Sequence, residues 1–155
     1  GGDTSRNPEV QAEVLEGLCP PVGLETLHIL GYEGSKYPNW MVSTHSEGPN
    51  ELQELWLYGW SQHGPAPELE AFAHLCSLGL WNCTWFALPC NMKHLMSLKR
   101  LLIDACLNIR SLPTLPLSLE EFTLKRCNVE FVKSCETHGH PNWQKIEHIT
   151  CKIVG

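Results

Sequence analysis

The sequence lacks several features that define common classes of protein. It has no run of about 18 apolar residues, so no membrane-spanning helix is predicted. The first residues, Gly-Gly-Asp-Thr-Ser-Arg, contain no apolar core of a secretory signal. Basic side chains number 11 against 17 acidic ones, which argues against general binding of nucleic acid phosphates.

Motifs for catalysis, nucleotide binding and metal binding are also missing. No GxSxG, HExxH or GxxxxGK[ST] sequence occurs, so we predict no catalytic residues, no cofactor and no metal in this chain. Cys135, His138 and His140 supply only three donors at a spacing unusual for tetrahedral zinc, and we interpret them as structural and loop residues. Asn82-Cys83-Thr84 fits the glycosylation pattern, which matters only for a secreted chain.

Cysteine is present without the spacing of a disulfide scaffold or a zinc site. The chain has 8 cysteines among 155 residues, and no two of them form a CxxC pair. A reduced, intracellular setting suits this composition, because disulfides persist mainly in oxidising compartments. We therefore predict eight free thiols.

One pattern recurs along the chain. An apolar residue is followed by two variable residues, an apolar one, a variable one and an apolar one, then by Cys or an aromatic residue three positions later. The six copies begin at Leu24, Leu52, Leu75, Leu98, Leu119 and Ile146. The starts are 28, 23, 23, 21 and 27 residues apart, in or close to the 20 to 29 residues of leucine-rich repeats.

This pattern predicts an α/β fold of the leucine-rich-repeat type. The last two apolar positions alternate, so they point to one face of a short strand, which only the next coil can bury. The expected architecture is a horseshoe-shaped solenoid with a parallel concave sheet of about six short strands and a mostly irregular convex side. Residues 1–23 are predicted to be the helical segment of a truncated repeat, and residues 24–155 the repeats with a C-terminal cap. Helices are predicted at residues 8–18 and 68–75.

The residues between the strand leucines should face outward on the concave side. There Trp56, Tyr58 and Trp81 are expected to cluster beside His28 and to form a protein-binding site, because rigid aromatic side chains dominate interface energetics. Packing under the insertion at residues 33–50 stays open as the alternative.

Further side chains are candidates for the edges of this face. Arg100, Asp104, Lys125 and Arg126 form either its electrostatic rim or an ordinary solvated surface. Loop residues are expected to extend it, namely Tyr37 and Trp40, or His63 and Pro65. In the last copy, Thr150 and Lys152 are assigned to the same outward rows.

Several stretches resemble a known family. The runs Glu13-Val-Leu-Glu-Gly-Leu-Cys-Pro-Pro, Leu24-Glu-Thr-Leu-His-Ile-Leu-Gly-Tyr-Glu-Gly and Tyr37-Pro-Asn-Trp-Met resemble the leucine-rich region of plant intracellular immune receptors of the coiled-coil, nucleotide-binding, leucine-rich-repeat type. Leu80-Trp-Asn-Cys and Asn142-Trp-Gln-Lys-Ile-Glu-His-Ile look like the last repeats of such receptors.

The resemblance implies a protein-binding, regulatory module without chemistry of its own. Its partners would be a pathogen effector or an altered host protein, and in cis the nucleotide-binding domain that it helps to hold inactive. ADP or ATP would bind in an upstream domain outside these residues. The location implied is the cytoplasm, with the nucleus or the plasma membrane surface as further sites.

Two other classes of protein fit the sequence less well. A secreted leucine-rich-repeat protein that binds an extracellular protein or peptide is disfavoured, because the sequence shows no signal peptide, no paired terminal cysteines and no repeated Gly-x-Ile-Pro. A catalytic protein with a site inserted among the repeats would need a nucleophile and base motif, which the sequence does not contain.

Overall fold

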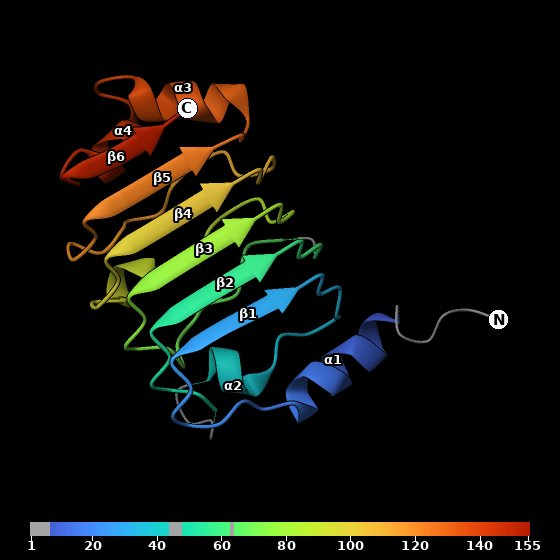
Figure 1. Cartoon of the computed structure of the whole chain (residues 1–155). Coiled ribbons are helices and arrows are strands. Elements are labelled where there is room, and N and C mark those ends of the chain that lie inside the picture. Colours follow the sequence, from blue (N-terminus) through green and yellow to red (C-terminus); the bar gives the residue numbers. More distant parts are fainter. Residues whose placement is uncertain (1–6, 44–47, 63) are drawn as a thin grey trace.

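A computed structural model describes residues 7–43, 48–62 and 64–155, and it contains a six-stranded parallel sheet (Figure 1). The strands are β1 (Thr26–Leu30), β2 (Glu54–Tyr58), β3 (Ser77–Trp81), β4 (Arg100–Asp104), β5 (Glu121–Lys125) and β6 (Cys151–Val154). They lie in sequence order, and each pairs in parallel with the next. The predicted leucine-rich-repeat solenoid is confirmed.

Alternation within each strand decides which side chains enter the core. In β2, Leu55 is 0% and Leu57 1% exposed, whereas Trp56 and Tyr58 beside them stay half-exposed. The strands pair without a shift, so that Leu55 lies opposite the equivalent leucine of β3. Burying a leucine side chain contributes about 1.5–3 kcal/mol, and this gain is repeated with every coil that stacks on its neighbour.

In the second to fifth copies of the pattern, the closing residue connects its coil to the preceding one. Its side chain donates a hydrogen bond to a backbone carbonyl of the strand before it. The pairs are Trp60 with Ile29 (3.3 Å), Cys83 with Leu57 (3.7 Å), Cys106 with Leu80 (3.7 Å) and Cys127 with Ile103 (3.8 Å). The cysteine thiol and the tryptophan indole N–H therefore have the same structural role, which is to donate a hydrogen bond to the preceding strand. All eight cysteines are free, and burial raises the pKa of Cys127 to about 11.

The backbone turns sharply after each of the first five strands. The residues there have positive φ angles: Gly31 (70°), Gly59 (67°), Asn82 (52°), Ala105 (56°) and Arg126 (52°). This conformation extends the hydrogen bonds between neighbouring strands by one residue, because the N–H of Ala105 donates to the carbonyl of Lys125 at 2.9 Å. Left-handed backbone costs a non-glycine residue roughly 1–2 kcal/mol, so Ala105 is a strained choice at this position.

Replacing Ala105 by glycine should therefore stabilise the fold. We expect Ala105→Gly to raise the free energy of unfolding by about 0.5–1 kcal/mol, because relief of the strain outweighs the extra entropy of glycine in the unfolded chain. Urea unfolding monitored by circular dichroism measures this change. Ala73→Gly is the matched control, because Ala73 is exposed and has no positive φ, and it should lose stability. Loss of stability in both variants would contradict the role given to the left-handed turn.

One of the two predicted helices is present in the structure, and the other is not. Helix α1 (Pro8–Gly17) occupies the expected span and begins at Asn7, whose side chain accepts hydrogen bonds from the N–H groups of the first turn. A short helix α2 (Asn39–Val42) follows β1. The helix predicted at residues 68–75 is wrong. Two successive i→i+3 turns replace it, from Leu69 to Phe72 and from Phe72 to Leu75, because they bring the chain back to the sheet in few residues.

Further helices lie on the return path after β3 and at the C-terminal end. A 3₁₀ helix, η2 (Met92–His94), lies on the return path between β3 and β4. Helices α3 (Val129–Glu136) and α4 (Pro141–Ile146) follow β5 and precede β6 in the sequence. They close the β6 end of the sheet (Figure 1).

The register predicted for the last copy is wrong. Thr150 was expected opposite Thr123, but Ile153 takes that place and β6 begins at Cys151. The apolar spacing is used differently here: Ile146 ends α4, and Ile149 is buried at 2% exposure before the strand starts. Lys152 consequently points to the opposite face from Ile153 and donates to the carbonyl of Ile149 at 2.9 Å.

Asn142 connects the C-terminal helices to the preceding coil. It is 4% exposed, and its Oδ1 accepts the N–H of Leu112 at 2.9 Å. Its Nδ2 donates to the carbonyl of Arg110 at 3.2 Å and to Ser134 Oγ at 2.8 Å. A buried amide with all of these partners is stabilising, and it fixes α4 against α3.

The cysteine and histidines of this region have separate structural roles. Cys135 is buried, His138 stacks on Trp143 with ring centroids 4.6 Å apart, and His140 Nδ1 accepts the N–H of Asn142 at 3.0 Å. Over residues 7–43, 48–62 and 64–155, no group of three or more His, Cys, Asp or Glu side chains is placed to hold a metal ion.

Candidate functional site

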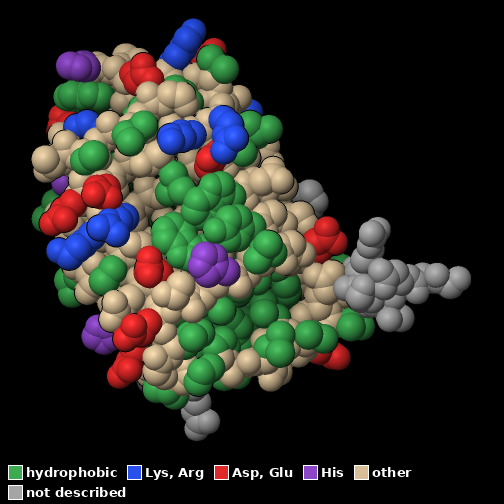
Figure 2. Space-filling view, in the orientation of Figure 1, with side chains coloured by type: hydrophobic (Ala, Val, Ile, Leu, Met, Phe, Trp, Pro, Cys, Tyr) green, Lys and Arg blue, Asp and Glu red, His purple; other side chains and the backbone are tan. Residues whose placement is uncertain are grey.

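Four ring side chains gather on the outward face of the first three strands. We call them the aromatic patch: His28 on β1, Trp56 and Tyr58 on β2, and Trp81 on β3. Figure 2 shows hydrophobic side chains gathered at the middle of this face, with Lys and Arg side chains beside them toward the β5 end. The predicted grouping of these residues is therefore present in the structure.

The rings of the aromatic patch support one another across the strands. Tyr58 stacks on Trp81 with centroids 4.7 Å apart and planes at 14°, and His28 lies parallel to Tyr58 at 6.0 Å. Trp56 is tilted against Trp81 at 5.4 Å. The Tyr58 hydroxyl and His28 Nδ1 are 3.4 Å apart. Such contacts hold the rings in place before any partner binds, which lowers the entropy lost on association.

Gly79 makes room for the two indole rings. It is buried in the middle of β3, and a Cβ atom there would lie 2.2 Å from Cε3 of Trp56 and 2.4 Å from Cζ3 of Trp81. Any larger residue would displace both rings. The sequence places Gly79 in the central outward row, but only the contacts across neighbouring coils show why it must be glycine.

The indole N–H groups distinguish the core tryptophans from those of the aromatic patch. Trp40, Trp60 and Trp85 are buried, and each donates to an acceptor inside the chain; these acceptors are the carbonyls of Leu15 and Ile29 and the hydroxyl of Tyr37. Trp56 and Trp81 are half-exposed, and neither N–H has a partner among the described residues. The aromatic patch thus presents two unused hydrogen-bond donors at its surface.

Tyr37 and Trp40 of the insertion at residues 33–50 neither cover the aromatic patch nor extend it. Trp40 is 3% exposed, and Tyr37 stacks on Trp60 with centroids 6.0 Å apart in a separate buried cluster. The expectation that Tyr37 and Trp40 extend the aromatic patch is wrong, because Trp40 belongs to the buried core and the half-buried Tyr37 packs against that core. His63 and the insertion residues 44–47 lie outside the described residues.

Two of the four charged candidates pair with each other. Asp104 is 4% exposed and accepts from Arg126 at 2.8 Å through Nε and 2.6 Å through Nη2. The carboxylate beside it raises the pKa of the Arg126 guanidinium. Asp104 is therefore a buried ion-pair partner and not part of a solvated rim. Asp104 and Arg126 are 22 residues apart, which is about the length of one repeat. Opposite charges at that spacing are the sequence signal that could have predicted this ion pair.

The other two charged candidates differ in their surroundings. Arg100 Nε lies 3.1 Å from Glu121 Oε2 on the neighbouring strand, and both side chains are largely exposed, so the pair contributes little to stability. Lys125 is exposed on β5, and no group in the described part of the chain pairs with its ammonium. Its charge is available to a partner.

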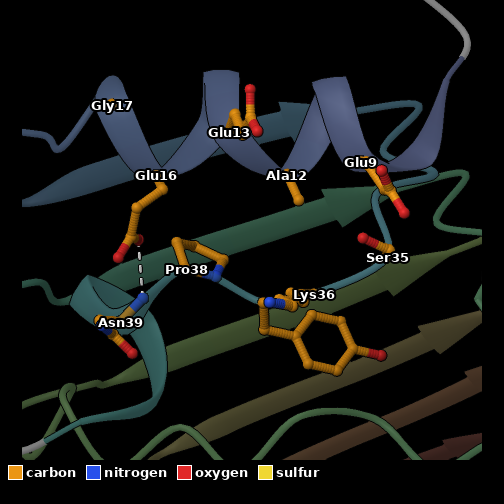
Figure 3. Close-up of a pocket in the computed structure, with 10 residues that line it drawn as sticks. Glu9, Ala12, Glu13, Glu16, Gly17, Ser35, Lys36, Pro38 and Asn39 are labelled. Atoms are coloured by element: carbon orange, nitrogen blue, oxygen red, sulfur yellow. Dashed lines mark hydrogen bonds between the residues drawn. The ribbon is translucent and has the colours of Figure 1, made fainter.

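A hollow with a volume of about 970 Å³ lies between α1 and the segment after β1 (Figure 3). Glu9, Glu13 and Glu16 of α1 line it together with Lys36. Glu16 Oε2 accepts the N–H of Asn39 at 2.8 Å, and this bond attaches the helix to α2. The hollow therefore belongs to the packing of α1 on the first coil.

A parallel sheet built from repeated short strands, with irregular returns and an outward row of aromatic residues, defines a leucine-rich-repeat protein. Residues 2–83 match the family described as R13L1/DRL21 LRRs, and the chain belongs to this family of leucine-rich repeats. Searches of curated proteins and of solved structures returned no match. The leucine-rich-repeat fold is generally a scaffold for protein interaction, and this chain is a protein-interaction module of that type.

In the described ranges, none of the helices has the length and apolar character needed to span a bilayer.

Proposed function

We propose that the chain is the recognition module of a plant intracellular immune receptor and that the aromatic patch binds its protein partner. The observation that supports this most is the half-exposed, internally stacked group of Trp56, Tyr58 and Trp81 on rigid strands. Rings of this size gain much from burial, so leaving them at the surface indicates a partner that buries them. Arg100, Lys125 and Arg126 would contribute charge beside the patch, with Asp104 holding Arg126 in position.

The mechanism follows from differential binding. The repeats would contact the nucleotide-binding domain of the same receptor in its inactive, ADP-bound state. A pathogen effector, or a host protein altered by one, would bind the concave face and favour the active state. ADP or ATP would bind upstream and not to these residues. Eight free thiols, several of them buried, suit a cytoplasmic location.

An assay of the receptor that contains this chain tests the proposal. Trp56, Tyr58 and Trp81 are replaced together by serine, and the dose of the matching pathogen protein needed for leaf cell death is measured. We expect the dose to rise at least tenfold while protein accumulation stays equal. The control variant carries Lys93→Ser on η2, away from the sheet, and should respond like the wild type. An unchanged dose for the triple variant would contradict the proposal.

A further inference from the structure

On the outward face of the sheet, each carboxylate has at least one partner within the chain, whereas several N–H donors have none among the described residues. Asp104 is bonded by Arg126, Glu121 pairs with Arg100 at 3.1 Å, and Glu54 Oε2 accepts from Thr26 Oγ1 at 3.1 Å. Across the six described strands, no carboxylate on this face is left without a partner.

The donors on the same face are not engaged to the same degree. The indole N–H groups of Trp56 and Trp81 and the ammonium of Lys125 have no partners in the described part of the chain. Arg126 is 74% exposed, and only two of its N–H groups bond to Asp104. A guanidinium has five N–H groups, so three remain for a partner.

Apolar side chains complete this surface. Leu30 on β1 is 73% exposed and pairs with Tyr58, and Leu102 on β4 lies beside Gly79 in the central row. Lys125 is two strands beyond Trp81, which corresponds to about 10 Å at a strand spacing of about 4.8 Å. The face therefore runs from an apolar aromatic end at β1 to β3 to a cationic end at β4 and β5.

We propose that the protein segment bound here carries an apolar anchor residue followed, about 10 Å away, by one or two carboxylates. This inference rests on the proposed function and specifies the chemistry of its partner. The anchor would cover the aromatic patch, backbone or side-chain oxygens would accept from the two indole N–H groups, and a carboxylate would pair with Lys125 and Arg126. A charge-assisted hydrogen bond is roughly twice as strong as a neutral one.

The same arrangement disfavours a basic partner. A Lys or Arg side chain placed at the β5 end would meet the unpaired ammonium of Lys125, and the carboxylates of Asp104 and Glu121 beside it already pair with Arg126 and Arg100. Selectivity for acidic over basic segments is therefore part of the proposal.

A selection from a random 12-residue peptide library, made against the purified 155-residue chain, tests this chemistry. We expect the selected peptides to combine an aromatic or leucine residue with Asp or Glu. The indole N–H resonances of the chain, recorded by nitrogen-15 NMR during titration, report where each peptide binds. Only the resonances of Trp56 and Trp81 should shift, since the other indoles are buried or lie on α4.

Charge reversal on the chain gives the decisive comparison. Lys125→Glu should lower the affinity for the acidic peptides about tenfold or more, and Lys125→Gln should lower it by a smaller factor. Lys93→Glu on η2 makes the same charge change elsewhere and should leave the affinity unchanged. Circular dichroism confirms that each variant is folded.

The outcomes separate this inference from the proposed function. Some peptides could shift the resonances of Trp56 and Trp81 but carry no excess of acidic residues, or bind the Lys125→Glu variant with unchanged affinity. Either result would overturn the acidic preference and leave the binding face intact. Peptides that bind without shifting either resonance would contradict the binding face itself. A library that yields no binder would count against the acidic segment.

Discussion

Leu101→Ala should lower the free energy of unfolding by about 2–5 kcal/mol, as expected for truncation of a buried leucine. Leu101 is 2% exposed in the middle of the sheet, where it lies between Leu78 of β3 and Phe122 of β5. Neither neighbour can move into the gap, because each is held by its own coil. The loss therefore includes both the transfer free energy and an unfilled cavity.

The adjacent residue supplies a matched control for this change. Leu102 is the same residue type on the same strand, but it faces outward and is half-exposed. Leu102→Ala should cost less than about 1 kcal/mol, near the value for surface substitutions. Urea unfolding of both variants measures the difference, and equal losses would show that the two faces of β4 are wrongly assigned.

Trp81→Ala should weaken binding of the protein partner by about 2 kcal/mol or more while leaving the fold largely intact. The ring contacts Tyr58 and Trp56 but remains half-exposed, so its loss removes surface stacking and little core. We expect the melting temperature to fall by about 2–4 °C, which corresponds to about 1 kcal/mol for a chain of this length.

Another tryptophan provides the comparison for Trp81. Trp143 on α4 is also half-buried and also stacks on one ring, that of His138, but it lies at the C-terminal end and outside the aromatic patch. Trp143→Ala should cost similar stability and no affinity. Affinities that fall equally in both variants would point to a general effect of unfolding and not to the patch.

Much of the fold is predictable because one residue spacing decides it. Alternation at Leu55 and Leu57 places both in the core whichever residues surround them, and the same holds for the next three strands. Where two structures satisfy the same spacing, prediction fails. Ile146 and Ile149 suit a strand pattern, yet Pro141 at the start of α4 and the cap at His140 favour a helix. At residues 68–75 an apparently helical spacing is met by two turns.

The candidate site is predictable only to the level of which side chains face outward. Trp56, Tyr58 and Trp81 follow from alternation alone. The need for glycine at position 79 and the burial of Asp104 depend on side chains from neighbouring coils, which a single repeat does not contain. Asn142 is similar, since its three partners come from other segments and no local pattern marks it.

Site-specific photocrosslinking tests most directly whether the aromatic patch is the binding face. A benzophenone amino acid is placed at Leu30, which is exposed beside Tyr58, or at Lys93 on η2, in the receptor expressed in challenged leaf cells. We expect one adduct with a pathogen or host protein from position 30, its loss when Trp81→Ala is added, and no such adduct from position 93. An adduct formed only from position 93, or one from position 30 that persists with Trp81→Ala, would contradict a concave aromatic binding site.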